Sequence, residues 1–143
     1  MAHAETHEVL NVDYDKLFDV ITRYEDYPQF IDGVKSVQVE RKGPGHARVK
    51  YHISMIKDVI YTLDLKENRQ AGTIQWTLVE SDFFKVNNGG WKIKSVGIDK
   101  TDALYAVDID FKIFVPSMIL NKLIKGSFPS MIKNFENRAK NGG

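Results

Sequence analysis

The sequence contains no cysteine, so it offers neither a disulfide framework nor a thiolate metal site. No apolar run approaches the ~20 residues that a membrane-spanning helix needs, and no basic-then-apolar secretory signal opens the chain. The formal charge of +1 gives no overall attraction to nucleic acid or to a charged membrane. These absences favour a cytoplasmic protein and leave peripheral attachment to a membrane as an open alternative.

Patterns that support catalysis or metal binding are also scarce. The four histidines, His3, His7, His46 and His52, lack metal-ligand spacing, and no serine lies in a nucleophile elbow. Glu80 is the one acid in phase with an inward row of strand residues, where burial would raise its pKa; the alternative is a solvated strand end. No second group is placed to orient Glu80 as a general acid or base. The sequence therefore predicts no catalytic residue, no metal and no cofactor, and an enzyme is the weaker class.

A long succession of alternating apolar and polar residues occupies the middle of the chain. Its 143 residues can bury about two-thirds of the unfolded surface, and we expect one domain over residues 1–143. The alternation predicts antiparallel strands with one apolar and one polar face. The expected strands cover residues 5–12, 34–40, 47–55, 59–66, 74–78, 91–95 and 103–113. Turn signals lie at 43–45, 57–58 and 69–72, and the run 87–90 (Asn-Asn-Gly-Gly) precedes the strand at 91–95.

Two short helices are expected between the first strand and the second. Asp13 is the expected N-cap of a helix over 14–24. Pro28 favours the first turn of a second, very short helix, which Gly33 ends.

The helix expected over residues 115–140 is the longest element, with Ser117 as its N-cap and 141–143 (Asn-Gly-Gly) as its stop. Gly126 and Pro129 predict a kink near 126–129. Its apolar residues fall on one face at helical spacing: Leu120, Leu123, Ile124, Phe128, Met131 and Phe135. Its lysines fall on the opposite face: Lys122, Lys125, Lys133 and Lys140.

A strongly curved sheet wrapped around this last helix would bury every apolar face at once. The predicted fold is therefore α+β. A curved antiparallel sheet of about six to seven strands surrounds a long C-terminal helix, and two short helices follow the first strand.

Local motifs in this order resemble the START-like (SRPBCC, helix-grip) superfamily, most nearly its coenzyme Q-binding, polyketide cyclase/dehydrase and ribosome association toxin group. The motifs are Phe18-Asp19-Val20-Ile21, Tyr24-Glu25-Asp26-Tyr27-Pro28-Gln29-Phe30, Val34-Lys35-Ser36-Val37, and Phe84-Lys85 followed by Gly90-Trp91. Residues 31–33 (Ile-Asp-Gly) replace the Leu-Pro-Trp of many relatives, which argues against transferring quinone specificity. The resemblance implies an elongated apolar cavity between the sheet and the last helix.

Large aromatic residues are frequent on the inward phase of the strands. The pattern alone allows either a closed core, with hydroxyls bonded to backbone, or a cavity with a few polar tips. The resemblance favours the cavity. Its expected lining is Phe30, Val49, Tyr51, Ile53, Tyr61, Leu63, Trp76, Leu78, Trp91, Tyr105, Val107, Ile109, Phe111, Leu120, Ile124, Phe128, Met131 and Phe135.

We therefore expect a carrier or chaperone for a hydrophobic small molecule: a lipid, a quinone such as ubiquinone, or a polyketide-like compound. The alternatives are an interaction protein resembling the ribosome association toxin and a polyketide cyclase-like enzyme. The lysine face of the last helix is either solvated or in weak contact with an anionic membrane or the ribosome. No DNA partner is expected, because that face lacks the interleaved aromatic residues that stack on bases.

Overall fold

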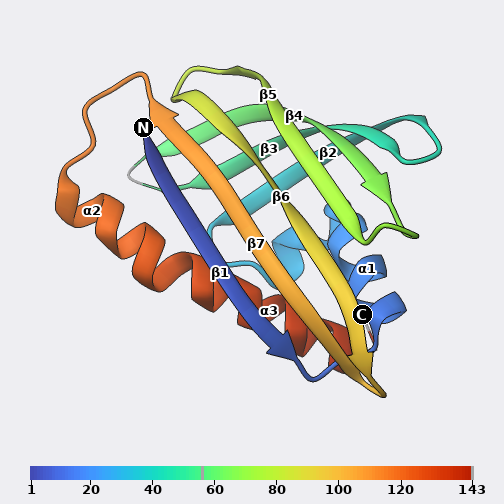
Figure 1. The fold of residues 1–143 in the computed structure, drawn as a ribbon. Coiled ribbons are helices and arrows are strands. Elements are labelled where there is room, and N and C mark those ends of the chain that lie inside the picture. The colour runs from blue at the N-terminus through green and yellow to red at the C-terminus, as the bar shows by residue number, and fades with distance from the viewer. Residues whose placement is uncertain (56, 143) are drawn as a thin grey trace.

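A seven-stranded antiparallel sheet dominates the computed structural model, which describes residues 1–55 and 57–142 (Figure 1). The strands are β1 (Ala2–Leu10), β2 (Val34–Gly43), β3 (His46–Ser54), β4 (Asp58–Asn68), β5 (Thr73–Ser81), β6 (Phe84–Gly97) and β7 (Lys100–Phe111). Their spatial order is β1-β7-β6-β5-β4-β3-β2. The predicted meander is therefore confirmed for β2 to β7, and β1 pairs along the outer edge of β7.

Pairing between strands places the large aromatic residues on one face of the sheet. Tyr51 of β3 lies opposite Tyr61 of β4, and Trp91 of β6 lies opposite Tyr105 of β7. On the other face, Asp108 accepts a hydrogen bond from His3 at 2.8 Å. A shift of one residue in the pairing would exchange the apolar and polar faces of the strand. The burial of the apolar residues therefore specifies this register.

The run 87–90 lies inside β6, so the strand predicted to begin at Trp91 begins at Phe84 instead. Glycine here serves close packing between strands. A Cβ on Gly89 would lie 2.3 Å from the carbonyl oxygen of Ala106, and one on Gly90 would lie 2.7 Å from that of Ile74. The glycines therefore let β6 fit between β5 and β7, where the sequence suggested only a break.

Two short helices follow β1, as predicted. The carboxylate of Asp13 accepts a hydrogen bond from the backbone N–H of Lys16 and caps α1 (Tyr14–Thr22). This helix ends two residues before the predicted end because Arg23 leaves helical geometry, with φ −90° and ψ 69°. The second, η1 (Tyr24–Gln29), is a 3₁₀ helix that contains Pro28.

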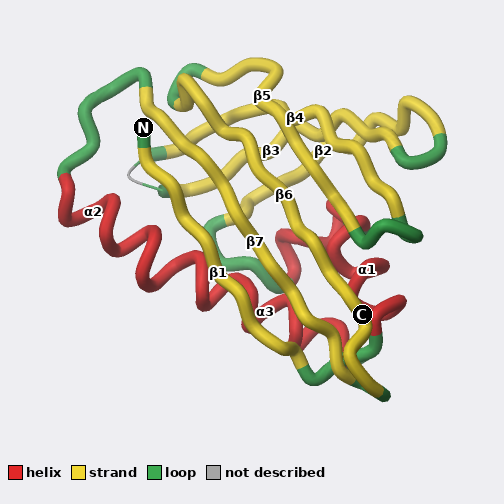
Figure 2. The backbone as a smooth tube through the Cα atoms, in the orientation of Figure 1, coloured by secondary structure: helices red, strands yellow, loops and turns green. Residues whose placement is uncertain are grey.

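The long C-terminal helix has three parts: α2 (Ser117–Lys122), a π-helical turn η2 (Leu123–Ser127), and α3 (Phe128–Lys140) (Figure 2). Pro116, rather than Ser117, occupies the N-cap position of α2. The irregularity predicted near 126–129 is the π turn, in which the N–H of Phe128 donates to the carbonyl of Leu123. Pro129 has no N–H with which to close the next regular turn.

The π turn alters which residues of the helix reach the cavity. A wider turn inserts an extra residue, so the phase of the residues before it shifts by one relative to α3. The predicted Leu123 borders the cavity together with Ile119, whereas the predicted Leu120 and Ile124 pack against the core without bordering it. The helix ends at Asn141, with Gly142 at φ 87°; the predicted stop at Gly143 falls outside the described residues.

The sheet arches over the helices, with α1 and α3 packed together at one end and α2 near the other (Figure 1). At the α1 end, Leu17, Ile21 and Phe135 are at most 2% exposed. Neither α2 nor η2 contains a buried residue. The packed core therefore lies towards α1, and the space beneath the sheet towards α2 is less filled.

Candidate functional site

A cavity of about 570 Å³ lies between the sheet and the C-terminal helix. This volume falls within the roughly 300–1,000 Å³ typical of small-molecule sites. Its wall is mainly apolar and combines side chains from all parts of the fold. The lining residues are Ile21, Tyr24, Tyr27, Ile31, Asp32, Gly33, Val34, Tyr51, Ile53, Ser54, Met55, Tyr61, Leu63, Leu65, Ile74, Trp76, Phe84, Asn87, Trp91, Tyr105, Val107, Ile109, Ile119, Lys122, Leu123, Ser127, Phe128, Met131 and Phe135.

Most of the predicted lining residues border this cavity. From the strands these are Tyr51, Ile53, Tyr61, Leu63, Trp76, Trp91, Tyr105, Val107 and Ile109. From the helix they are Phe128, Met131 and Phe135. The rings of Tyr105 and Phe128, 5.8 Å apart, show strand and helix facing each other across this space.

Six of the predicted lining residues lie elsewhere: Phe30, Val49, Leu78, Phe111, Leu120 and Ile124. Val49 is fully buried within the packed part of the core. Phe111 packs on Phe83, with ring centroids 5.2 Å apart, at the edge of the sheet. Phe30 lies outside the cavity wall beneath the guanidinium of Arg138, 5.3 Å from the ring centroid. The alternation along a strand or the spacing along a helix shows which residues face inward. It does not show whether an inward residue packs in the core or borders the cavity.

Irregular pairing on β5 displaces Glu80, whereas Leu78, which precedes the irregularity, packs against the core without bordering the cavity. The β5–β6 ladder ends at Trp76, and a register shift against β4 follows between the pairs Leu63–Leu78 and Thr62–Glu80. Such a bulge inserts one residue and reverses the facing of those beyond it. Glu80 is consequently exposed, and the buried acid considered from the alternation is ruled out at this position.

The sequence reading missed the part of the wall that comes from helices and loops. Tyr24, Tyr27 and residues 31–34 reach the cavity from η1 and the loop after it. Leu65 and Ile74 alternate with polar residues on the inward side of their strands, so the sequence pattern could have identified them as lining residues. For Tyr24 and Tyr27, the family motif that contains them was the available signal.

Three tyrosine hydroxyls in the wall have no hydrogen-bond partner among the described residues: those of Tyr51, Tyr61 and Tyr105. Among the described residues, every fully enclosed polar side-chain atom has a hydrogen-bond partner. These three hydroxyls have none, so they are not fully enclosed and must reach open space. Since all three residues border the cavity, that open space is the cavity itself. The rings of Tyr51 and Tyr61 are stacked with centroids 5.0 Å apart, so two of the three tyrosines are direct neighbours.

Two further tyrosines and the Trp76 indole of the wall have hydrogen-bond partners within the fold. Tyr24 donates to the carboxylate of Glu67, and Tyr27 donates to the carbonyl of Ile21. The indole N–H of Trp76 donates to the amide oxygen of Asn87 at 3.1 Å. The tyrosine trio therefore stands apart as hydrogen-bonding capacity left for a bound molecule.

Burial raises the pKa of all three of these tyrosines above the ordinary value. The phenol is the favoured form in an apolar surrounding because the charged phenolate loses its hydration there. At neutral pH each hydroxyl is therefore protonated and is able both to donate and to accept a hydrogen bond.

The cavity opens to solvent at the α2 end. The exposed members of its lining are Asp32, Gly33, Ser54, Ile119, Lys122 and Ser127. They come from the loop before β2, the end of β3, and the α2–η2 segment. We call the opening between them the mouth.

The four lysines predicted to share an exposed helix face separate into different environments. Lys133 and Lys140 lie 3.0 and 3.9 Å from the carboxylate of Glu136, which is buried. Lys122 borders the mouth instead of pointing away from the sheet, as a result of the phase shift at the π turn. Lys125 is exposed.

Over the described parts of the chain, no three His, Asp or Glu side chains are grouped closely enough to hold a metal ion. No helix within residues 1–55 and 57–142 is both long and apolar enough to cross a membrane. The ionisable groups that border the cavity, besides its tyrosines, are Asp32 and Lys122 at the mouth.

Comparison with solved structures finds the same fold in several proteins at low sequence identity. The ZhuI aromatase/cyclase from Streptomyces has a TM-score of 0.86 at 12% identity, over 97% of this chain and 93% of its own. A START superfamily protein from Mycobacterium smegmatis has a TM-score of 0.85 at 16% identity, over 99% of both chains. An 18 kDa protein from Caulobacter crescentus has a TM-score of 0.80 at 20% identity, over 99% of this chain and 97% of its own.

These similarities establish a START-like, helix-grip fold. A search of curated proteins by sequence found no match. The family described as polyketide cyclase / dehydrase and lipid transport matches residues 10–136, which is most of the sequence. The chain therefore belongs to the polyketide cyclase/dehydrase and lipid transport family.

Proposed function

We propose that this protein binds one apolar small molecule in the cavity beneath the sheet and acts as its carrier or chaperone. The observation that carries the proposal is a mainly apolar hollow of about 570 Å³ whose exposed lining residues lie on loops and on the weakly packed α2–η2 segment. An unfilled space of this size removes packing contacts and destabilises the fold unless a ligand occupies it.

The unpartnered hydroxyls of Tyr51, Tyr61 and Tyr105 narrow the class of ligand. A pure hydrocarbon would leave them without hydrogen bonds in an apolar site, at an energetic cost. A lipid, quinone or polyketide-like molecule with carbonyl or hydroxyl oxygens partway along its body would satisfy them. We therefore favour an oxygenated apolar ligand over a plain acyl chain.

The experiment that tests this proposal is native mass spectrometry of the purified protein, followed by solvent extraction and identification of the molecule that co-purifies. The expected result is one bound molecule per chain, apolar and carrying oxygen atoms. Tyr51→Phe with Tyr61→Phe should lower its occupancy, whereas Tyr14→Phe serves as the control because that hydroxyl donates to the carbonyl of Arg69 outside the cavity. Absence of any bound molecule, together with no uptake of an apolar fluorescent probe, would refute the proposal.

A polyketide cyclase-like enzyme is the second candidate, favoured by the same three hydroxyls and by the fold shared with an aromatase/cyclase. Protonated phenols can donate hydrogen bonds to a carbonyl as it gains negative charge during ring closure. Incubation of the protein with a poly-β-keto thioester distinguishes the two candidates. If the protein converts the thioester and Tyr51→Phe abolishes that conversion, the enzyme replaces the carrier as the proposed function.

The ribosome-binding alternative came from the resemblance, and contact with an anionic membrane or RNA was one interpretation of the lysine face. Lys133 and Lys140 share the carboxylate of Glu136, whereas Lys122 borders the mouth. This location favours a contact made where ligand enters and leaves.

A further inference from the structure

Exposed apolar side chains gather beside the mouth, on the connection from β7 to α2 and on the first turn of α2. Phe114 is 86% exposed and Met118 is 81% exposed, with Ile113 and Ile119 exposed next to them. We call residues 112–125 the rim segment. Single exposed apolar residues are ordinary on a protein surface, but a group of four on one short segment marks an interaction site.

The charge of the rim segment has one sign. It contains Lys112, Lys122 and Lys125, and no aspartate or glutamate occurs between residues 112 and 127. Met118 and Lys122 lie at i and i+4 on α2 and so share a side of that helix, and Lys125 follows within the π turn. Basic groups thus lie directly beside the apolar ones.

The rim segment is also weakly attached to the rest of the fold. Among the described residues of α2 and η2 none is buried, and no side chain caps the start of α2. In α3, by contrast, Ile132, Phe135 and Ala139 are at most 2% exposed. Leu120, Leu123 and Ile124 pack partly against the core, whereas Phe114 and Met118 are left exposed and are available to an external partner.

We propose that the rim segment docks on an anionic lipid bilayer, with Phe114 and Met118 entering its interface while Lys122 and Lys125 contact lipid phosphates. The pattern of apolar tips beside lysines matches the chemistry of that interface. A second copy of the chain fits less well, because a two-fold contact would bring the same lysines together. An RNA fits less well because Phe114 is the single aromatic residue of the segment, and stacking on bases uses several.

Docking would direct the mouth towards the lipid and so provide a route for an apolar ligand into the cavity. This consequence rests on the proposed carrier function, whereas the docking itself does not. Binding to vesicles and binding of an apolar probe are therefore measured separately. Loss of probe binding with intact vesicle binding would refute the carrier alone, and the reverse result would refute the docking alone.

The test is flotation of the full chain with phosphatidylcholine vesicles that contain either no phosphatidylserine or about 30 mol% phosphatidylserine. The expected result is binding to the anionic vesicles that weakens with added salt, since charge contacts are screened. Each lysine near such a surface contributes about fivefold to partitioning, so Lys122→Gln with Lys125→Gln should lower binding about 25-fold. Phe114→Ser with Met118→Ser should lower it at least about tenfold.

Matched controls come from the hairpin between β6 and β7. Ile98 is 93% exposed, so Ile98→Ser removes a similar apolar tip away from the mouth. Lys92→Gln with Lys94→Gln removes two exposed charges from β6. Both controls should bind vesicles as the unmodified protein does.

Equal loss in the rim variants and in the hairpin controls would overturn the proposal. So would equal binding to neutral and anionic vesicles. A third result would also overturn the proposal: the protein does not bind vesicles but forms a concentration-dependent dimer that Phe114→Ser disrupts. The rim segment would then be a contact with a second copy of the chain.

Discussion

The two ends of the C-terminal helix show opposite ways of using an apolar surface. At the α1 end, Phe135 of α3 packs edge-on against Tyr27, Phe30 and Trp91, with ring centroids 5.1–5.3 Å apart. At the α2 end no described residue of α2 is buried, and Phe114 and Met118 are 86% and 81% exposed. One chain thus keeps a tightly packed half and an open half within a single helix.

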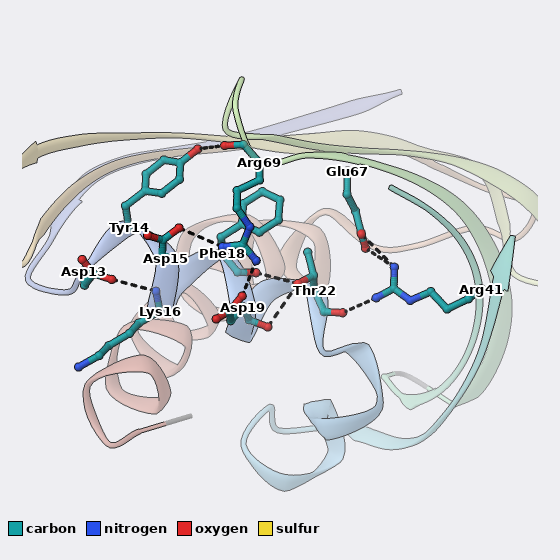
Figure 3. A network of polar contacts seen from close by, with 10 residues as sticks. All are labelled: Asp13, Tyr14, Asp15, Lys16, Phe18, Asp19, Thr22, Arg41, Glu67 and Arg69. Carbon is teal, nitrogen blue, oxygen red and sulfur yellow. Dashed lines mark hydrogen bonds and ion pairs between the residues drawn. The ribbon is translucent and has the colours of Figure 1, made fainter. Parts of the chain in front are cut away.

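Polar contacts reinforce the packed end. Arg69 from the β4–β5 turn bonds to Asp15 and Asp19 of α1 and lies over the ring of Phe18, 4.4 Å from its centroid (Figure 3). Arg41 of β2 bonds to Glu67 and to the carbonyl of Thr22, which ties the edge of the sheet to the end of α1. These contacts hold α1 against the sheet from outside.

The difference between the ends teaches that stability and access are provided by different residues. Side chains of α1 and α3 fill the packed end, whereas no described residue of α2 is buried. Under the proposed function, the α2 end is where a ligand would enter. Substitutions at the two ends should therefore have effects of different size and kind.

The largest contrast is expected between two phenylalanines of α3. Phe135→Ala should lower the free energy of unfolding by about 3–5 kcal/mol, because a buried ring with three aromatic neighbours is lost. Phe128→Ala should lower it by about 1–2 kcal/mol, because this half-buried ring already borders a hollow and no complete new void is created. Chemical denaturation followed by tryptophan fluorescence measures both. Equal and large losses would mean that Phe128 fills a core, and the contrast between the ends would disappear.

A smaller effect is expected at Glu136, which joins α3 to the loop after β1. Its buried carboxylate accepts from the backbone N–H of Asn11 at 2.6 Å and from Lys133 at 3.0 Å. Burial acts to raise the pKa of Glu136, but these hydrogen bonds and the charges of Lys133 and Lys140 hold that pKa below its ordinary value of 4.5. Glu136→Gln should therefore cost about 1–2 kcal/mol at pH 7, since charged hydrogen bonds become neutral ones.

The pH dependence of this effect follows from the direction of the shift. A carboxyl with a lowered pKa in the folded protein adds stability above its unfolded pKa and loses it as pH falls through the folded pKa. The difference in unfolding free energy between the unmodified protein and Glu136→Gln should be constant above about pH 6 and should shrink below pH 4.5. A difference that stays constant down to pH 3, about 1.5 units lower, would show that the lowered pKa is not the cause.

The smallest expected effects distinguish two kinds of buried tyrosine. Tyr27→Phe removes the hydrogen bond to the carbonyl of Ile21 and should cost about 1 kcal/mol. Tyr51→Phe removes a hydroxyl without a partner among the described residues and should leave stability within about 0.5 kcal/mol of the unmodified protein. The order should reverse for ligand occupancy, which Tyr51→Phe lowers more. If Tyr51→Phe proves as destabilising as Tyr27→Phe, the Tyr51 hydroxyl has a hydrogen-bond partner within the fold. It would then not be available to a ligand, contrary to the proposal.

Strand alternation was sufficient to predict the sheet and much of the cavity wall. Tyr51, Tyr61 and Tyr105 could be assigned to one face because side chains on a strand alternate strictly. Departures from the regular repeat decided the open cases. A bulge on β5 places Glu80 in solvent, which was one of its two interpretations, and the π turn brings Ile119 to the cavity while the predicted Leu120 and Ile124 do not border it.

The remaining errors concern packing rather than secondary structure. Val49 and Val107 have the same phase and similar size, yet Val49 is enclosed by other side chains and Val107 borders the cavity. Only the three-dimensional curvature of the sheet decides between these positions. The pairs that Lys133 and Lys140 make with Glu136 are different, because their i,i+3 and i,i+4 spacing on α3 could have been found in the sequence.

The pair Val107 and Val49 also provides the most direct test of the central claim, that a hollow able to receive an apolar molecule lies beneath the sheet. The measurement is titration of an apolar fluorescent probe into Val107→Phe and Val49→Phe, with unfolding free energies determined in parallel. The account predicts that Val107→Phe keeps its stability within about 1 kcal/mol and loses probe binding, because the ring enters open space. It predicts that Val49→Phe loses about 1–3 kcal/mol through overpacking and still binds the probe while folded. Equal destabilisation by both substitutions, with no probe bound by the unmodified protein, would show that the interior is a closed core and would contradict the account.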